Sequence, residues 1–307
     1  MKFALCNELF EAWNTNQGFD FPRTFEYVKK CGYDGVEIAP FTMEKDAFHI
    51  SASRRAEIRR LAEKNNLEIS GLHWLLAKTE GYSLTSPDPN LRQKTADYFS
   101  ELIRLCADLD GHFMVLGSPQ QRNLLPNVTQ DQAFDYAADV LQKVLPILET
   151  CDVQIAVEPL SPKETNFLTT AAEAVHLIKK IGCPERIALH LDCKAMCSEG
   201  WSIPELIREY KEHLIYFHLN DPNLQGPGFG ELDFVPIVAA LLEIGYHGWA
   251  SVEVFEYAPG IETLAEKSLA YTKRCLEEAH RAAPRHKLGV FAEPPKCRPL
   301  APLGGEG

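Results

Sequence analysis

Short apolar runs alternate with longer amphipathic stretches along most of the 307-residue chain. The runs are rich in Val, Ile, Leu and Phe, a composition typical of strands that are buried on both faces. They cover residues 2–7, 35–40, 67–76, 112–118, 153–160, 186–192, 214–220 and 249–255. This pattern predicts eight β-strands, each separated from the next by a helix-sized segment.

The intervening stretches place apolar residues at helical spacing. Residues 19–32 are one example, and Gly32 ends the pattern in the way a glycine helix cap does. Further helices are predicted over 53–65, 89–110, 129–150, 170–182, 202–212, 234–244 and 261–280. Eight strand-then-helix units predict a single-domain (β/α)8 TIM barrel of the α/β class.

A doubly wound parallel sheet is the alternative architecture. That fold usually carries a Gly-rich phosphate loop directly after its first strand. Residues 6–14, CNELFEAWN, contain no glycine, so the barrel is favoured. Residues 281–307 lack any period and are rich in Pro and Gly. We therefore predict a barrel over 1–280 and an irregular C-terminal tail over 281–307.

Composition limits the partners and the compartment. The net charge of −12 would repel a phosphate backbone, so no nucleic-acid partner is expected. No window reaches about 18 uninterrupted apolar residues, so no membrane span is predicted. The N-terminal segment lacks the apolar core of a signal peptide, and the nine cysteines form no paired framework. These features predict a cytoplasmic protein with reduced thiols.

Polar residues mark the carboxyl ends of four successive predicted strands, where (β/α)8 barrels place their active sites. They are Glu158, Asp192, His218 and Glu253. One such residue alone is more often a helix cap or an ion-pair partner, but four on adjacent strands indicate a site. Three carboxylates and one imidazole suit Mn²⁺, Mg²⁺ or Co²⁺, and they also accept Zn²⁺.

Several segments then carry a family resemblance. AVEPLSPKETNF, LHLDCKAM, FHLNDPNLQGPGFGELDF and SVEVF resemble the sugar phosphate isomerase/epimerase family with a xylose isomerase-like TIM barrel. Within it, the chain is most similar to the ketose 3-epimerase and inosose dehydratase type. GYDGVEIAP and SGLHWLL also fit, and the resemblance covers about residues 1–280. The four polar residues are separated by 34, 26 and 35 positions, in agreement with the family's metal ligands.

The resemblance implies that Glu158, Asp192, His218 and Glu253 bind one divalent metal ion, with Mn²⁺ the first choice. Glu158 and Glu253 would also be the catalytic acid/base pair. One carboxylate removes a proton next to a carbonyl through a metal-stabilised enediolate, and the other returns a proton. The expected function is therefore a divalent-metal-dependent isomerase/epimerase acting on a keto-sugar or related polyol.

Other residues are predicted to bind substrate. Glu164 lies six residues after Glu158, where epimerase-like members have a substrate-binding glutamate, although a solvated loop carboxylate fits the sequence equally well. His73 lies at the predicted end of strand three. Trp74 follows it and offers a stacking surface, with core packing as the competing interpretation.

Two positions depart from the family pattern. Family members commonly have a substrate-binding histidine three residues after the strand-six aspartate, where this chain has Ala195. The ketose 3-epimerases have an arginine six residues after the strand-seven histidine, where this chain has Leu224. Lys194 or His190 are the candidates to replace these contacts. The departures indicate a different or less polar substrate end.

Two other functions remain open at this stage. One is a lyase on the same scaffold, such as an inosose or dehydroshikimate-type dehydratase or a 3-keto-C-glycoside-cleaving subunit. The other is a non-catalytic barrel with a structural metal. The expected partner is a small sugar or cyclitol, and the resemblance also raises the hypothesis of a homo-oligomer. The sequence does not identify the substrate or the metal.

Overall fold

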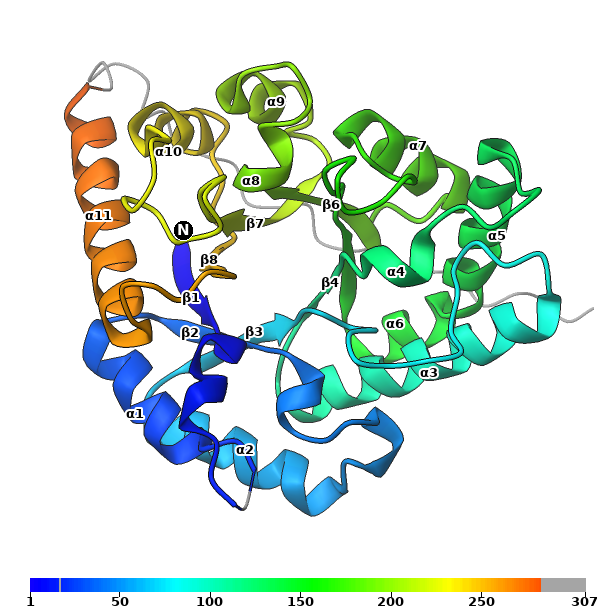
Figure 1. Ribbon diagram of the computed structural model, residues 1–307, viewed down its shortest axis with the longest axis horizontal. Helices are drawn as coiled ribbons and strands as arrows, with labels where there is room; N and C mark the ends of the chain where they lie inside the picture. The colour runs from blue at the N-terminus through cyan, green and yellow to red at the C-terminus, as the bar shows by residue number, and fades with distance from the viewer. Residues whose placement is uncertain (17, 283–307) are drawn as a thin grey trace, which may run out of the picture.

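A computed structural model describes residues 1–16 and 18–282, and it contains a closed barrel of eight parallel strands. Each strand pairs with the next in sequence order, and β8 pairs with β1 to close the barrel (Figure 1). The predicted (β/α)8 TIM barrel is confirmed. Of the predicted tail, 281–307, residues 283–307 lie outside the described part of the chain.

The strands occupy the predicted positions and are shorter than the apolar runs. They are β1 (Lys2–Cys6), β2 (Gly35–Ile38), β3 (Glu68–Leu72), β4 (Phe113–Leu116), β5 (Gln154–Val157), β6 (Ile187–Asp192), β7 (Leu214–Leu219) and β8 (Trp249–Val252). The ends of the runs fall in the loops that follow the strands. Glu158 and Glu253 are therefore the first residues after β5 and β8, whereas Asp192 and His218 lie within β6 and β7.

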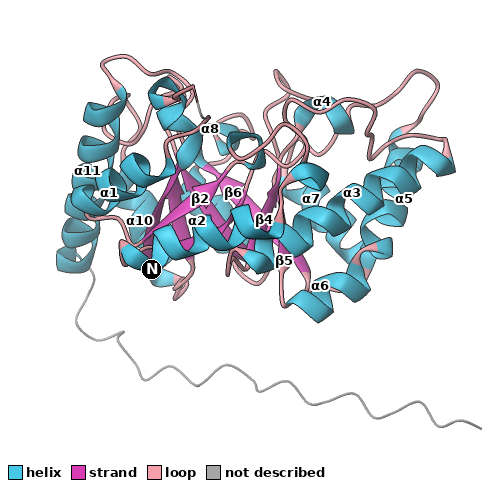
Figure 2. Cartoon of the chain, turned by 90° about the horizontal axis from the view of Figure 1, so that it is seen from below, coloured by secondary structure: helices cyan, strands magenta, loops and turns pink. Residues whose placement is uncertain are grey.

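Helices surround the barrel on all sides (Figure 1). The longer ones are α1 (Phe21–Cys31), α2 (Ala52–Lys64), α3 (Pro89–Asp108), α5 (Gln130–Lys143), α6 (Leu145–Cys151), α7 (Ala171–Ile181), α9 (Ile203–Glu209), α10 (Phe234–Glu243) and α11 (Ile261–Ala282). Short helical turns are η1 (Asn7–Trp13), η2 (Pro40–Thr42), η3 (Ala47–His49), α4 (Pro119–Arg122) and α8 (Cys193–Met196). Figure 2 shows α4, α8 and the longer loops along one edge of the barrel, at the carboxyl ends of the strands.

One predicted helix is two helices in the structure. The sequence predicts a single helix over 129–150, but α5 ends at Lys143 and α6 begins at Leu145. Pro146 explains the break, because its nitrogen has no proton to donate to the carbonyl of Gln142 and its ring crowds that turn. The capping box at Thr129 begins α5 one residue after the expected start.

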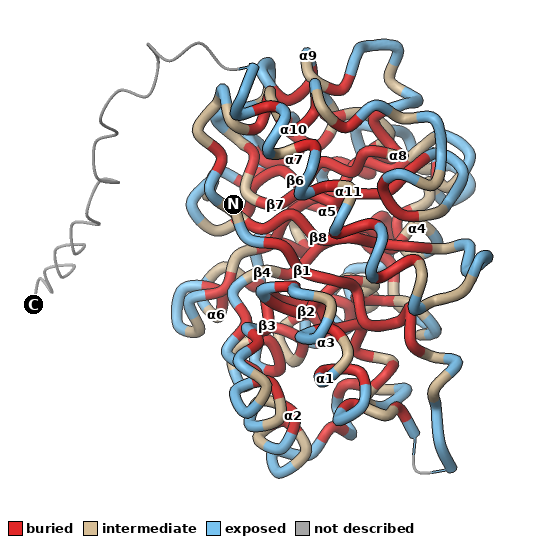
Figure 3. Tube along the Cα trace, turned by 90° about the vertical axis from the view of Figure 1, so that its left-hand side faces the viewer, coloured by how far each residue is buried: buried red, intermediate tan, exposed pale blue. Residues whose placement is uncertain are grey.

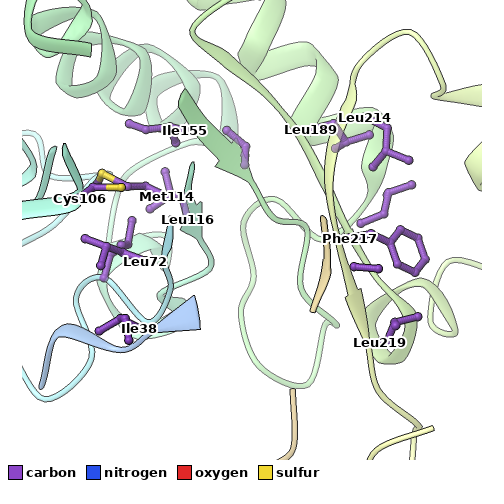
Figure 4. Close-up of a cluster of buried hydrophobic side chains, with 14 of the residues drawn as sticks. Ile38, Leu72, Cys106, Met114, Leu116, Ile155, Leu189, Leu214, Phe217 and Leu219 are labelled. Atoms are coloured by element: carbon purple, nitrogen blue, oxygen red, sulfur yellow. The ribbon is translucent and has the colours of Figure 1, made fainter. Parts of the chain in front are cut away.

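The apolar core has two layers. The outer layer packs the helix faces against the strands, and Figure 4 shows part of it around Leu72, Met114 and Ile155. A smaller cluster lies inside the barrel and comprises Ala4, Val115, Ala156, Tyr216 and Trp249. Figure 3 shows the resulting continuous burial along the strands. This interior layer lies beneath the polar residues at the carboxyl ends of the strands, and the Tyr216 hydroxyl connects it to Glu37 and Ser70.

Two further predictions concern the described residues. None of the helices in residues 1–16 and 18–282 is long and apolar enough to cross a bilayer. The eight cysteines in the same part of the chain are all free thiols.

Candidate metal centre

The four predicted metal ligands meet in the mouth of the barrel. Glu158, Asp192, His218 and Glu253 each offer one donor atom, and these four atoms all lie within 4.8 Å of one another. All four side chains are buried. The strand register explains this convergence, because Asp192 pairs directly with His218 across β6 and β7. Glu158 and Glu253 approach from β5 and β8, the strands on either side of that pair.

The orientation of Asp192 is fixed by the local backbone. It is the last residue of β6 and the N-cap of α8, where its Oδ1 accepts the backbone N–H of Ala195 at 2.7 Å. The side-chain amide of Asn220 donates to Oδ2. Both oxygens are therefore held by the chain before any ligand arrives.

His218 is held in an orientation that suits a metal ligand. Its Nε2 lies 3.0 Å from Glu37 Oε2, so an Nε2–H donor is satisfied there. Nδ1 faces Glu253 and lies 3.2 Å from its Oε2, within ion-pair distance. Histidines that bind metals usually give one N–H to a carboxylate and use the other nitrogen as the ligand. Burial lowers the pKa of His218, but Glu37 and Glu253 outweigh this effect and raise it.

Glu37 is completely buried in β2, where it supports His218 from below. Burial raises the pKa of Glu37, but His218 and His73 outweigh it and lower the pKa to about 2. The Tyr216 hydroxyl lies 3.0 Å from Glu37 Oε2 and 2.7 Å from Ser70 Oγ. Glu37 is therefore an ionised carboxylate that fixes the imidazole of His218.

The electrostatics of the cluster are dominated by the carboxylates, which favour a bound positive charge. Burial and then the neighbouring Glu253 and Asp192 raise the pKa of Glu158 well above its ordinary value. Burial and Glu253 also raise the pKa of Asp192, against the opposing charge of Lys194. Three buried carboxylates this close together repel one another unless protons or a cation intervene. The donor set, with His218 Nδ1 directed toward the carboxylates, therefore fits a hard divalent cation.

A cavity of about 480 Å³ opens over this cluster, within the size range of small-molecule sites. Its lining comprises His73, Trp74, Ala77, Lys78, Val115, Gly117, Ser118, Pro119, Gln120, Gln121, Glu158, Leu160, Glu164, Lys194, His218, Glu253 and Phe255. Glu158 and Glu253 thus face the cavity as well as the cluster.

Trp74 connects the cavity wall to Glu253. Its indole Nε1–H donates to Glu253 Oε1 at 2.8 Å, and its backbone adopts a left-handed conformation with φ of 51°. Its ring lies 6.1 Å from that of Phe255 and 5.9 Å from that of Phe41. Trp74 therefore both orients a carboxylate and forms part of an aromatic wall.

Lys194 and Glu164 meet at the cavity wall. Lys194 Nζ lies 2.7 Å from Glu164 Oε1, and Glu164 Oε2 accepts from the hydroxyl of Ser161 at 2.8 Å. The ammonium also lies 4.8 Å from the ring centre of Phe255. The pair supplies the charged groups that the cavity offers on the side of β5 and β6.

His190 lies beneath the cluster rather than in the cavity wall. Its ring is 4.3 Å from that of His218, and neither ring nitrogen has a hydrogen-bond partner in the part of the chain that the structure describes. Burial and the neighbouring His218 lower its pKa well below the ordinary value. The cavity lining does not include His190, so a substrate bound in the cavity would not contact it in this structure. Of the two candidates to replace the family contacts, only Lys194 faces the cavity.

The two departures from the family pattern lie on the loops around the mouth. Ala195 is buried, and its backbone N–H donates to Oδ1 of the N-cap residue Asp192. Leu224 is 44% exposed, and its carbonyl accepts the N–H groups of Phe255 and Glu256 at 2.8 Å. Leu224 therefore ties the loop after β7 to the loop after β8 through its backbone.

Sequence reasoning left several residues out of the site. Glu37 carried a signal, as a charge within an otherwise apolar strand, and Asn220 lies two residues after His218 on the same strand face. Glu8 and Arg122 carried none. Glu8 lies in η1, and its Oε2 is hydrogen-bonded to His73 Nε2. The guanidinium of the buried Arg122 donates to the carbonyl of Glu158 at 2.6 Å.

The protein is a (β/α)8 barrel with a polar site in the barrel mouth. The site consists of carboxylates and an imidazole at the carboxyl ends of β5 to β8. More specifically, the chain belongs to the xylose isomerase-like TIM barrel family, which it matches over residues 25–275. The predicted family is thereby confirmed.

Known relatives are sugar epimerases. The D-psicose 3-epimerase of Ruminiclostridium cellulolyticum is 26% identical over 245 residues, which cover 79% of this chain and 81% of that protein. The fructoselysine 3-epimerase of Shigella flexneri is 20% identical over 246 residues, covering 78% and 87%. A solved L-ribulose 3-epimerase has a TM-score of 0.78 at 22% identity, covering 93% of this chain and 99% of that one. The structural likeness establishes the shared fold.

Proposed function

We propose that this protein is a divalent-metal-dependent sugar epimerase that moves a proton on a carbon next to a carbonyl. The observation that carries the proposal is the position of Glu158 and Glu253. Both line the cavity, and both belong to the cluster whose four donor atoms lie within 4.8 Å of one another. A substrate in that cavity would contact the two carboxylates from different sides of the barrel mouth, because β5 and β8 are three strands apart.

The chain's own residues would perform the proton transfers. One of Glu158 and Glu253 takes the proton from the substrate carbon, and the other delivers a proton to the opposite face. Trp74 holds Glu253 in place through its indole N–H. A cation held by Glu158, Asp192, His218 and Glu253 would supply Lewis-acid polarisation of the carbonyl, which makes the neighbouring C–H group more acidic.

The substrate class follows from the relatives and the wall. The relatives act on ketoses or a ketose conjugate, as their names state. Here the Lys194–Glu164 pair offers charged hydrogen-bonding groups, and Trp74 and Phe255 offer apolar faces. We therefore propose a keto-sugar or related polyol as substrate, with Mn²⁺ as the first metal to test and Mg²⁺, Co²⁺ and Zn²⁺ as alternatives.

Solvent exchange tests the proposal without assuming a product. The Mn²⁺-loaded protein is incubated with a panel of ketoses and keto-cyclitols in D₂O, and deuterium incorporation at carbon is followed by NMR. Exchange is expected in the wild type and is expected to disappear in Glu158→Gln and Glu253→Gln. An unsaturated product that absorbs in the ultraviolet would instead assign the protein as a lyase. Absence of exchange with every substrate would refute the epimerase assignment.

A further inference from the structure

A second group of potential ligands lies beside the first. Cys6, Glu8, His73 and Glu253 each offer one donor atom, and these atoms also lie within 4.8 Å of one another. All four residues are buried. Only Glu253 is shared with the first set. The other three come from β1, from the η1 turn after it and from the residue that follows β3.

This group contains buried polar atoms that make no hydrogen bond within the described residues. Glu8 Oε2 lies 2.7 Å from His73 Nε2, but Glu8 Oε1 is buried without a hydrogen-bond partner among the described residues. His73 Nδ1 likewise has no hydrogen bond there, and its nearest acidic atom is Glu37 Oε1 at 3.8 Å. The Cys6 thiol has only two weak contacts at 3.5 Å, to Glu37 Oε2 and Ser251 Oγ. Buried polar atoms normally have partners, so this concentration of unused donor capacity needs an explanation.

The charge of the barrel mouth gives an independent reason. Five buried carboxylates gather there, namely Glu8, Glu37, Glu158, Asp192 and Glu253. One divalent cation balances two of them. Lys194 pairs with Glu164, and Arg122 donates to backbone carbonyls. The imidazoles of His73 and His218 each lie between two of these carboxylates, and two imidazolium charges together with one divalent cation still do not balance five carboxylates. Negative charge therefore remains after the first ion binds, and either protons or a second cation must balance it.

We propose that Cys6, Glu8, His73 and Glu253 form a second divalent-cation site that is bridged to the first by the Glu253 carboxylate. A thiolate, an imidazole and two carboxylates form a softer set than the first one, and it suits Zn²⁺. Binding would release the proton of the Cys6 thiol to solvent, because only the thiolate is a ligand. Two ions sharing a carboxylate lie about 3.5–4 Å apart in known two-metal sites.

Metal content and spectroscopy test this site directly. The metal-free protein is loaded with Co²⁺ or Zn²⁺, the unbound metal is removed, and the bound metal is measured by mass spectrometry. Two ions per chain are expected in the wild type and one in Cys6→Ser. The Co²⁺ form should show a sulfur-to-cobalt charge-transfer absorption that Cys6→Ser lacks. Cys106→Ser is the matched control, because Cys106 is equally buried but lies in α3, where its thiol faces the carbonyl of Phe113 in β4. Figure 4 shows Cys106 beside Met114 in the apolar core.

A second variant keeps the test informative if Cys6→Ser does not fold. Glu8→Gln retains the shape of the side chain and is also expected to bind one ion and to lack the charge-transfer band. One ion per chain in the wild type, or a second ion that persists in both variants, would overturn this inference. The proposed function is tested separately, because one bound ion together with carbon exchange would leave the epimerase standing. Two bound ions without exchange would leave only the second site.

Discussion

Replacing Glu158 with Gln is expected to stabilise the metal-free protein while removing its response to metal. Glu158 has Asp192 and Glu253 as neighbours, with donor atoms at most 4.8 Å apart. At that separation each charged pair costs about 3.5 kcal/mol with an effective dielectric constant of about 20. The folded protein can avoid this repulsion by keeping Glu158 protonated. At pH 7, protonating a carboxyl group with the ordinary pKa of 4.5 costs about 3.4 kcal/mol, because the pH lies about 2.5 units above that pKa. This free energy is the upper limit of the penalty.

The sign of the effect depends on pH. The pKa of Glu158 is raised in the folded state by burial and by the two neighbouring carboxylates. The folded protein therefore has no penalty below the unfolded pKa and accumulates one as the pH rises toward the folded pKa. In EDTA, Glu158→Gln should exceed the wild type by up to about 3 kcal/mol in unfolding free energy at pH 7. At pH 4.5 most of this advantage should be absent.

Urea denaturation with and without Mn²⁺ measures both parts of the prediction. A ligand at about 100 times its Kd stabilises the folded state by about 2.7 kcal/mol, and the variant should lose most of this gain. Glu212→Gln is the control, because it removes a carboxylate whose side chain is 80% exposed. If Glu158→Gln is less stable than the wild type in EDTA at pH 7, the carboxylates do not repel one another as the geometry requires, and the reasoning fails.

Three further predictions concern the support of this site. Gly117→Ala would place a methyl group against Glu158 Oε2 and displace that carboxylate, so kcat/KM should fall about 100-fold in steady-state assays. Unchanged kinetics would contradict the close approach. Trp74→Phe removes the hydrogen bond from the indole N–H to Glu253, which is worth about 1.5–3 kcal/mol. The value of kcat should therefore fall about 10- to 100-fold, while the metal content measured by mass spectrometry stays constant. Arg122→Met removes the donor to the Glu158 carbonyl and should lower the unfolding free energy by about 2–4 kcal/mol in urea titrations, whereas a neutral result would show that the buried charge costs as much as its bonds contribute.

The fold was predictable because each strand is buried on both faces. That burial requires continuous apolar runs, and eight of them separated by helical periods leave few architectures. The helix boundary at Pro146 was missed, although proline carries a clear local signal, because the apolar period continues across it. The helical period is a property of the whole segment, whereas the break depends on one absent N–H group.

Part of the site was also predictable from the chain alone. Parallel strands in a barrel bring their carboxyl ends to one rim, so polar residues at the ends of successive strands must lie close together. This rule placed Glu158, Asp192, His218 and Glu253 in one cluster without knowledge of any distance. It worked because it needs only the position of each residue along its own strand.

The remaining features were decided by the closure of the barrel. The Glu37 contact to His218 joins β2 to β7, and the Trp74 hydrogen bond to Glu253 joins the end of β3 to the end of β8. These partners are 181 and 179 residues apart in the sequence and lie on strands that are not neighbours in the sheet. The sequence determined which residues reach the rim, because strand period and burial are local properties. Only the tertiary structure decided which of them face one another across the barrel, because that depends on the radius and stagger of the closed sheet.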